Sequence, residues 1–210
     1  MTGVFNYIKQ RQIRKIYIWN ITETFQILFD AVILNEKSQI RLASMKSEMH
    51  QRGFLSVRKL LQEAGFSDHD LDYDSFGKPH LNNGKHISIT HSHHFSAIII
   101  SNENCGIDME MQRKKIIKIA PKFIQSENAF LDDNSPDYIQ KLTIIWGIKE
   151  AIFKIRNEVG ISFKDHISVA PFTLSNQKAS AQLHFDQTIG SFVCPFETIE
   201  NFTLVYAFQN

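Results

Sequence analysis

Apolar segments of two kinds follow one another along this chain in an irregular order, and that order limits the possible folds more than any other feature. Segments rich in β-branched and aromatic residues, which predict strands, lie at 14–21, 86–92, 95–101 and 105–110. Segments with apolar residues at helical spacing lie at 22–34, where Thr22 or Thr24 is a suitable cap, and at 36–64. A parallel sheet would need a regular strand–helix–strand rhythm, which is missing here. We therefore expect an α+β fold.

The second half of the chain repeats this scheme loosely. Helices are expected at 114–125 and 136–157, and strands at 161–170, 179–186 and 200–208. We expect the loop 132–136 to cap the second of these helices. The chain of 210 residues is long enough for two small cores. We predict two α+β subdomains, residues 1–104 and 105–210.

Composition excludes several classes of function. The formal net charge is +1, and no stripe of basic and aromatic residues is present, so a nucleic-acid binder is not expected. The two cysteines suit a reducing compartment. The longest apolar run, near 95–101, is too short to span a bilayer, and residues 1–15 lack the apolar segment of a signal peptide. We expect a cytoplasmic protein that does not enter a membrane.

The predicted strand in "CGIDMEMQ" (105–112) carries two acidic residues, Asp108 and Glu110. Residues two apart in a strand point to the same face, where two carboxylates repel each other. Two interpretations remain open at this point. The acids are solvated side chains on an edge strand, or they bind a hard cation such as Mg²⁺, which prefers carboxylate oxygens.

A second acidic position lies in "WGIKEAIFK" (146–154), where Trp146, Glu150 and Lys154 share nearly one helical face. An ordinary amphipathic helix with one Glu–Lys pair explains the same spacing. Alternatively, Glu150 completes a site of three carboxylates with Asp108 and Glu110, and Lys154 offers its ammonium group to a phosphate.

These segments together resemble a known signature. "GIDME" (106–110) followed by "WGIKEAIFK" (146–154) resembles the Gly-(Ile/Val)-Asp-x-Glu and Trp-x-x-Lys-Glu-(Ala/Ser)-x-x-Lys motifs of the 4′-phosphopantetheinyl transferase superfamily. Three upstream segments are similar to further family blocks: "RGFLSVRKLL" (52–61), "FGKPHL" (76–81) and "ISITHS" (87–92), in which Thr90 replaces a serine. The length is similar to that of the longer, monomeric branch.

The resemblance implies an enzyme that transfers the 4′-phosphopantetheine arm of coenzyme A to a serine of an apo acyl or peptidyl carrier protein. The reaction depends on Mg²⁺ and releases 3′,5′-adenosine bisphosphate. The implied fold has two similar subdomains related by a pseudo-twofold axis, with coenzyme A in the cleft between them. The alternative is a catalytically silent member that only binds carrier proteins or coenzyme A. The kind of carrier is not encoded in these motifs.

The resemblance also implies roles for individual residues. The metal ligands are Asp108, Glu110 and Glu150, and the catalytic residues are Glu150, which helps to take the serine proton, and Lys154, which contacts the pyrophosphate. The positions that match coenzyme A-binding residues of the family are Arg52, Lys78, Thr90, His91 and Lys154. Further candidates for phosphate contacts are Lys37, Arg41 and Arg58.

Two other features need separate interpretation. Many relatives have a glutamate, proposed as a base, where this chain has Asn128; Glu127 stands one position earlier and is assigned no catalytic role. "HSHH" (91–94), with Cys105, permits a transition-metal site as a less favoured alternative. We expect His93 and His94 to be exposed turn residues.

Overall fold

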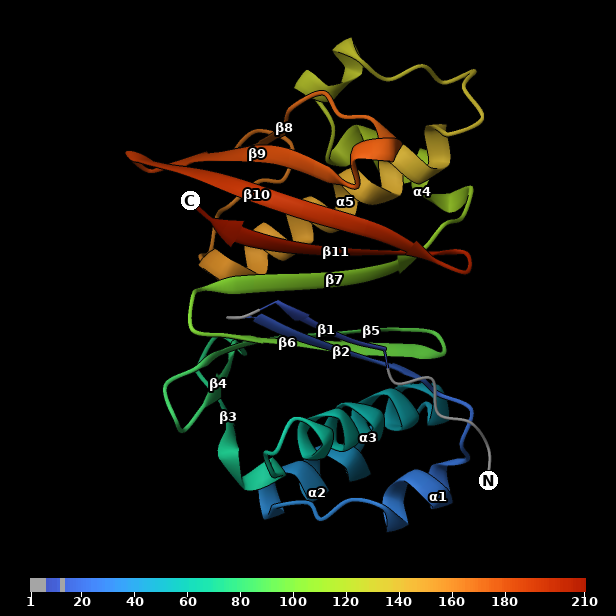
Figure 1. Ribbon diagram of the computed structural model, residues 1–210, viewed down its shortest axis with the longest axis vertical. Helices are drawn as coiled ribbons and strands as arrows, with labels where there is room; N and C mark the ends of the chain where they lie inside the picture. The colour runs from blue at the N-terminus through green and yellow to red at the C-terminus, as the bar shows by residue number, and fades with distance from the viewer. Residues whose placement is uncertain (1–6, 12–13) are drawn as a thin grey trace. The chain divides into compact units, whose positions relative to one another are not determined.

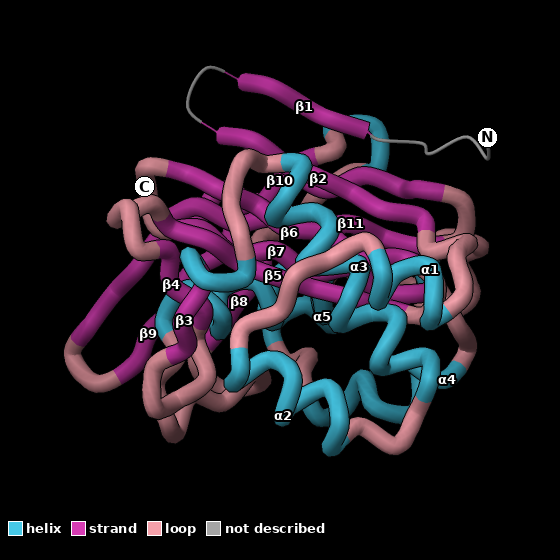
Figure 2. Tube along the Cα trace, turned by 90° about the horizontal axis from the view of Figure 1, so that it is seen from below, coloured by secondary structure: helices cyan, strands magenta, loops and turns pink. Residues whose placement is uncertain are grey.

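The computed structural model describes residues 7–11 and 14–210, and the chain divides into two compact units, Met1–Glu103 (unit 1) and Asn104–Asn210 (unit 2). Each unit contains one antiparallel sheet and its own hydrophobic core (Figure 1). Strands β3 to β6 and strands β9 to β11 follow one another without an intervening helix. Figure 2 shows the strands in magenta and the helices in cyan. The prediction of an α+β fold is therefore confirmed.

The sheet of unit 1 has six strands in the order β1-β2-β6-β5-β4-β3. The strands are β1 (Tyr7–Arg11), β2 (Arg14–Asn20), β3 (Leu71–Tyr73), β4 (Pro79–Leu81), β5 (His86–Ser92) and β6 (Phe95–Ser101). Every residue of β6 is buried, which explains why its sequence is an almost continuous apolar run. The predicted strands at 86–92 and 95–101 are confirmed, whereas β3 and β4 are too short to give a periodic signal. His93 and His94 form the turn between β5 and β6, and the prediction that both are exposed is wrong, because both are partly buried.

The helices of unit 1 are α1 (Phe25–Asp30), α2 (Glu36–Ser44) and α3 (Glu48–Glu63), followed by the 3₁₀ turn η1 (Asp68–Asp70). The Thr24 hydroxyl caps α1 by accepting a hydrogen bond from the Ile27 backbone N–H. The prediction of one helix over 36–64 is wrong, because the backbone becomes extended at Met45 (ψ 124°). The break lets both halves of the apolar stripe pack inward, whereas an unbroken helix of this length would run straight for about 40 Å.

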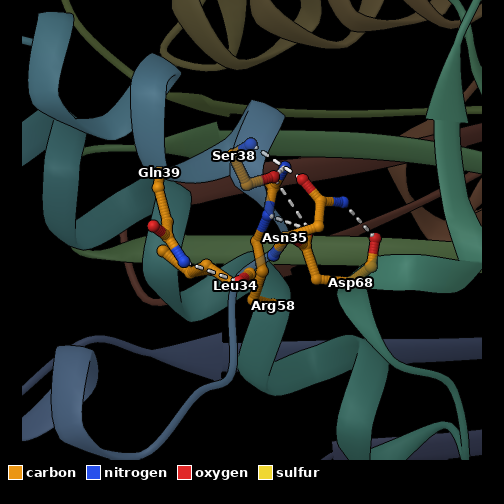
Figure 3. A network of polar contacts seen from close by, with 6 residues as sticks. All are labelled: Leu34, Asn35, Ser38, Gln39, Arg58 and Asp68. Carbon is orange, nitrogen blue, oxygen red and sulfur yellow. Dashed lines mark hydrogen bonds and ion pairs between the residues drawn. The ribbon is translucent and has the colours of Figure 1, made fainter.

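A buried polar network holds α2, α3 and η1 together (Figure 3). The Asp68 carboxylate accepts hydrogen bonds from the Arg58 guanidinium (2.9 Å), the Ser38 hydroxyl (3.0 Å) and the Asn35 backbone N–H (2.9 Å). The Asn35 side chain in turn caps α2 through the Ser38 N–H. Removing one partner would leave a buried charge without compensation, which typically costs about 3–5 kcal/mol.

The sheet of unit 2 has five strands in the order β7-β11-β10-β9-β8. The strands are β7 (Cys105–Met111), β8 (Ile167–Val169), β9 (Lys178–Phe185), β10 (Thr188–Ile199) and β11 (Phe202–Gln209). The sequence prediction missed β10, although Phe192, Cys194 and Phe196 alternate as buried residues. Pro195, which has no N–H to donate, lies in this strand and weakens its sequence signal.

The helices of unit 2 are α4 (Lys115–Ile119) and α5 (Tyr138–Arg156), with 3₁₀ turns at Ala120–Lys122, Ser126–Ala129 and Leu174–Asn176. The predicted helix at 114–125 is therefore too long, because Pro121 converts its second half into a turn. The predicted helix at 136–157 is confirmed as α5. Its N-cap residue is Asp137, without a side-chain capping bond, so the predicted cap in 132–136 is wrong. No helix among the described residues is long and apolar enough to cross a membrane.

Candidate active site

Two glycines set the distance between α5 and the edge strand β7 in unit 2. A Cβ atom on Gly106 would lie 1.9 Å from the backbone carbonyl oxygen of Ala151 on α5. A Cβ atom on Gly147 would lie 2.9 Å from Cγ2 of Val205 on β11 and 3.6 Å from Oδ2 of Asp108. Because side chains alternate along a strand, Asp108 shares the face of Gly106 and points toward α5. The close approach of helix and strand therefore brings Asp108 to the helix.

The three carboxylates predicted from the sequence interact in this region. Asp108 is only 4% exposed, which excludes its interpretation as a solvated surface acid. Burial raises the pKa of Glu110 to about 7, and the Asp108 charge adds to the increase, while a hydrogen bond from Trp146 opposes it. Burial likewise raises the pKa of Glu150 to about 7, with further increases from the charges of Asp108 and Glu110. The three acids thus lie close enough to disfavour one another's charge.

Lys154 supplies a positive charge to this acidic group. Its ammonium group donates hydrogen bonds to Oδ1 of Asp108 (2.9 Å) and to the backbone carbonyl of Ile107 (2.8 Å). The same charge opposes the increase in the pKa of both Glu110 and Glu150. Lys154 lies one helical turn after Glu150, as the sequence spacing indicated, but its direct contact with Asp108 links α5 to β7.

The adjacent residue on α5, Lys149, lies in a different environment. Its ammonium group is completely buried and contacts Oε1 of Glu127 (2.8 Å) and the backbone carbonyls of Phe123 and Phe163. Glu127 also accepts hydrogen bonds from two backbone N–H groups. Burial alone would raise the pKa of Glu127, but the hydrogen bonds from Lys149 and the backbone outweigh this effect and lower it.

This buried pair therefore anchors α5 to the preceding loop. Asn128, the position where many relatives have a glutamate, is exposed and donates a hydrogen bond to the Gln125 carbonyl. One signal for the pair was visible in the sequence: Lys149 interrupts a helical stretch in which Ile145, Ile148 and Ile152 are all buried. A buried lysine requires a partner of opposite charge.

The acidic group suits a hard cation by its chemistry but is not arranged as a metal site. Carboxylate oxygens are the ligands that Mg²⁺ prefers. However, no group of three or more His, Cys, Asp or Glu side chains in the described part of the chain is positioned to hold a metal ion. Oδ1 of Asp108 already contacts the ammonium group of Lys154. The same finding gives no support to a transition-metal site formed by residues 91–94 and Cys105.

A small cavity opens beside this group within unit 2. Its volume is about 160 Å³, and its lining residues include Glu110, Arg113, Lys115, Thr143 and Trp146. Its mixed lining of basic and apolar side chains suits a ligand with a charged end and an apolar body.

The residues matched to coenzyme A binding in unit 1 have different surroundings. Arg52 on α3 donates from Nη2 to the Ile21 carbonyl (3.1 Å). His91 is exposed, and its ring centre lies 6.3 Å from that of His50. Thr90 is buried, and Lys78 lies partly buried in the turn before β4. Arg52 and His91 are both accessible enough to meet a ligand, whereas Thr90 is restricted by its burial.

The three further candidates in unit 1 already have partners. Lys37 pairs with Asp72 at an exposed site (3.0 Å), where an ion pair contributes little to stability. The Arg41 guanidinium lies over the rings of Phe54 and Tyr73. Arg58 is buried in the network with Asp68, so we assign it a structural role.

Comparison with models of protein families gives a match. The sequence model of the family described as the 4′-phosphopantetheinyl transferase superfamily matches residues 104–202. The match covers most of unit 2, including Asp108, Glu110, Glu150 and Lys154. No curated protein matched the chain.

Proposed function

We propose that this chain, whose residues 104–202 match the sequence model of the 4′-phosphopantetheinyl transferase superfamily, transfers the 4′-phosphopantetheine arm of coenzyme A to a serine of an apo acyl or peptidyl carrier protein. In this reaction the serine oxygen forms a bond to the phosphorus that carries the arm, and the pyrophosphate linkage breaks. The serine proton is removed, and 3′,5′-adenosine bisphosphate leaves. The family match supports transfer to carrier proteins as a class; the acceptor serine and the leaving nucleotide are part of the proposal.

The observation that carries the proposal is the acidic group of Asp108, Glu110 and Glu150 beside Lys154, within the matched segment. Asp108, Glu110 and Glu150 would hold Mg²⁺ only after their side chains rearrange, because among the described residues no three such groups are positioned as a metal site. A bound cation would neutralise charge developing on phosphate oxygens. In the metal-free protein, the ammonium group of Lys154 neutralises the Asp108 carboxylate. We propose that Lys154 exchanges Asp108 for a pyrophosphate oxygen of coenzyme A, because an ammonium group suits either anion.

Glu150 is the proposed acceptor of the serine proton, directly or through one water. A general base works best when its pKa lies near the working pH. Burial and the neighbouring carboxylates raise the pKa of Glu150 to about 7 in the metal-free protein. A bound cation would lower this pKa, so the proposed role depends on the position of Glu150 beside Asp108 and Glu110. Asn128 has no proton-accepting carboxylate, so we do not route the proton through it.

Unit 1 is the proposed source of contacts to the nucleotide end of coenzyme A. Arg52 and His91 would hold phosphate oxygens, with Lys78 and Thr90 as supporting contacts. Guanidinium groups bind phosphate through two parallel hydrogen bonds, so Arg52 is the strongest candidate. We further propose that the protein acts in the cytoplasm as a monomer.

The proposal is tested by incubating the full-length protein with coenzyme A, Mg²⁺ and a panel of apo acyl and peptidyl carrier proteins. Transfer adds the mass of one phosphopantetheine arm to a carrier and releases adenosine bisphosphate in equal amount. A carrier in which the acceptor serine is replaced by alanine serves as the control. Binding of carriers without any gain in mass would instead indicate the catalytically silent alternative.

A further inference from the structure

The Glu110 carboxylate borders open space and is restrained by a neighbouring indole ring. Glu110 lines the cavity of about 160 Å³ in unit 2, which leaves its side chain room to change rotamer. Trp146, from α5, lines the same cavity, and its indole N–H donates a hydrogen bond to the Glu110 carboxylate. An indole ring has one donor and no acceptor. The orientation of the Glu110 carboxylate therefore depends on where the indole ring is held.

Two phenylalanine rings from different loops pack against this indole. The ring centre of Phe123 lies 5.1 Å from that of Trp146 in an edge-to-face arrangement, and the ring centre of Phe163 lies 5.4 Å from it. Phe123 belongs to the segment before α5, and Phe163 belongs to the segment after it. Aromatic pairs at such separations stabilise each other beyond the area that they bury. The two rings therefore act as a clamp on the indole.

The ammonium group of Lys149 ties both of these loops to α5. It donates hydrogen bonds to the backbone carbonyls of Phe123 (2.6 Å) and Phe163 (2.9 Å), the two residues whose rings contact the indole. The carboxylate of Glu127 neutralises the buried charge (2.8 Å). Breaking such a buried pair is costly, because it leaves a charge without compensation. The buried pair thus fixes where both phenylalanine rings lie.

Trp146 connects this buried pair to the acidic group. It lies three residues before Lys149 and four residues before Glu150, so it is adjacent to both on the surface of the helix. Lys149 is completely buried, whereas Glu150 interacts with the charges of the acidic group. A continuous set of contacts therefore leads from the buried pair, through the clamp and the indole, to Glu110.

We propose that Trp146 is a positioning residue, whose indole, held by the two phenylalanine rings, keeps the Glu110 carboxylate in one orientation within the acidic group. Groups that hydrogen-bond to metal-binding carboxylates orient them and raise the affinity for the metal. Lys154 acts in the opposite sense, because its ammonium group pairs with the Asp108 carboxylate and competes with a cation. The relevance of the indole to transfer rests on the proposed function, whereas the contacts themselves do not.

Titration of full-length variants with Mn²⁺ alone, followed by electron paramagnetic resonance, tests the inference. Trp146→Phe keeps an aromatic ring in the clamp but removes the donor, so we expect the affinity for Mn²⁺ to fall at least about tenfold. Trp146→His restores a ring N–H at the same bond distance from Cβ and should recover part of the loss. Trp19→Phe is the matched control, because Trp19 also donates to a glutamate, Glu23 (3.2 Å), but in unit 1. This control should bind Mn²⁺ as the wild type does.

A double variant separates positioning from a general effect on folding. If Trp146 acts through Glu110, adding Trp146→Phe to Glu110→Gln should change the affinity for Mn²⁺ little further, whereas independent effects would add. Phe163→Leu keeps the indole N–H but loosens the clamp, so it should weaken binding by a smaller factor than Trp146→Phe. Four results would overturn the inference: wild-type affinity in Trp146→Phe, equal losses in Trp146→Phe and Trp146→His, additive effects in the double variant, or no binding of Mn²⁺ by the wild type.

Transfer to apo carriers, measured in parallel, separates this inference from the proposed function. A loss of Mn²⁺ affinity that depends on Glu110, in a protein that modifies no carrier, refutes only the proposed function. Transfer by a protein whose affinity for Mn²⁺ is unaffected by Trp146→Phe refutes only the positioning role of the indole.

Discussion

At the scale of single residues, the proposed chemistry depends on four charged side chains whose identities were predictable and whose environments were not. The two-residue spacing of Asp108 and Glu110 and the four-residue spacing of Glu150 and Lys154 are visible in the sequence. The burial of Asp108 and its contact with Lys154 depend on the approach of α5 to β7, which no local pattern encodes. For the same reason, the buried pair of Lys149 and Glu127 was not predicted.

The raised pKa values give a prediction for the metal-free protein. Because Glu110 and Glu150 have a pKa of about 7 instead of 4.5, the folded state binds more protons than the unfolded state between these values. The free energy of unfolding should therefore decrease as the pH rises through this window. Asp108→Asn removes the shared repulsion and should make this decrease shallower. Urea unfolding at several pH values between 5 and 8, with a chelator present, measures how the free energy of unfolding changes with pH in the wild type and in Asp108→Asn. Equal slopes for the two proteins would contradict the repulsion between Asp108 and the two glutamates.

A second prediction concerns Lys154 as a counter-ion. Lys154→Gln removes the positive charge that pairs with the Asp108 carboxylate. Mn²⁺, used as a probe for Mg²⁺, should therefore bind the coenzyme-free variant at least about tenfold more tightly than it binds the wild type. Lys141→Gln is the matched control, because Lys141 lies on the same helix and pairs with Asp137. Titration followed by electron paramagnetic resonance gives both affinities. If the two variants bound Mn²⁺ equally, Lys154 would not compete with the cation.

At the scale of helices and strands, predictions succeeded where apolar periodicity was strong. The strands β5 and β6 and the helix α5 were predicted almost to the residue. The break at Met45 was missed because the apolar stripe continues across it, and β10 was missed because Pro195 weakens its sequence signal. In both cases tertiary packing, which is absent from a local pattern, determined the outcome.

Gly106→Ala tests the contact between β7 and α5. The added Cβ atom would collide with the Ala151 carbonyl, a backbone atom that cannot rotate away. We expect a loss of at least about 2 kcal/mol in the free energy of unfolding, measured by urea denaturation. In the comparison variant, Gly53→Ala, the nearest atom belongs to the His91 side chain at 3.2 Å, and the change should stay within about 1 kcal/mol. Similar values for the two variants would show that the close approach is not required.

At the scale of the whole molecule, the chain combines two units with separate hydrophobic cores. The family match covers unit 2, whereas Arg52, His93 and His94 line a cavity in unit 1. In the proposed reaction, the acidic group of unit 2 would provide the chemistry, and residues of unit 1 would contact the nucleotide. The α+β class was predictable from the order of segments, but the cavity in unit 1 was not, because it depends on the backbone of Ile21 meeting a turn some 70 residues later in the sequence.

The most direct test of the account compares phosphopantetheine transfer by the wild type, Asp108→Asn and Lys141→Gln under conditions where all three are folded. The mass of an apo carrier is followed over time with coenzyme A, with and without Mg²⁺. We expect the wild type and Lys141→Gln to add one arm per carrier only when Mg²⁺ is present, and Asp108→Asn to be slower by at least about a hundredfold. Transfer by Asp108→Asn at the wild-type rate, or no gain in mass on any carrier, would contradict it.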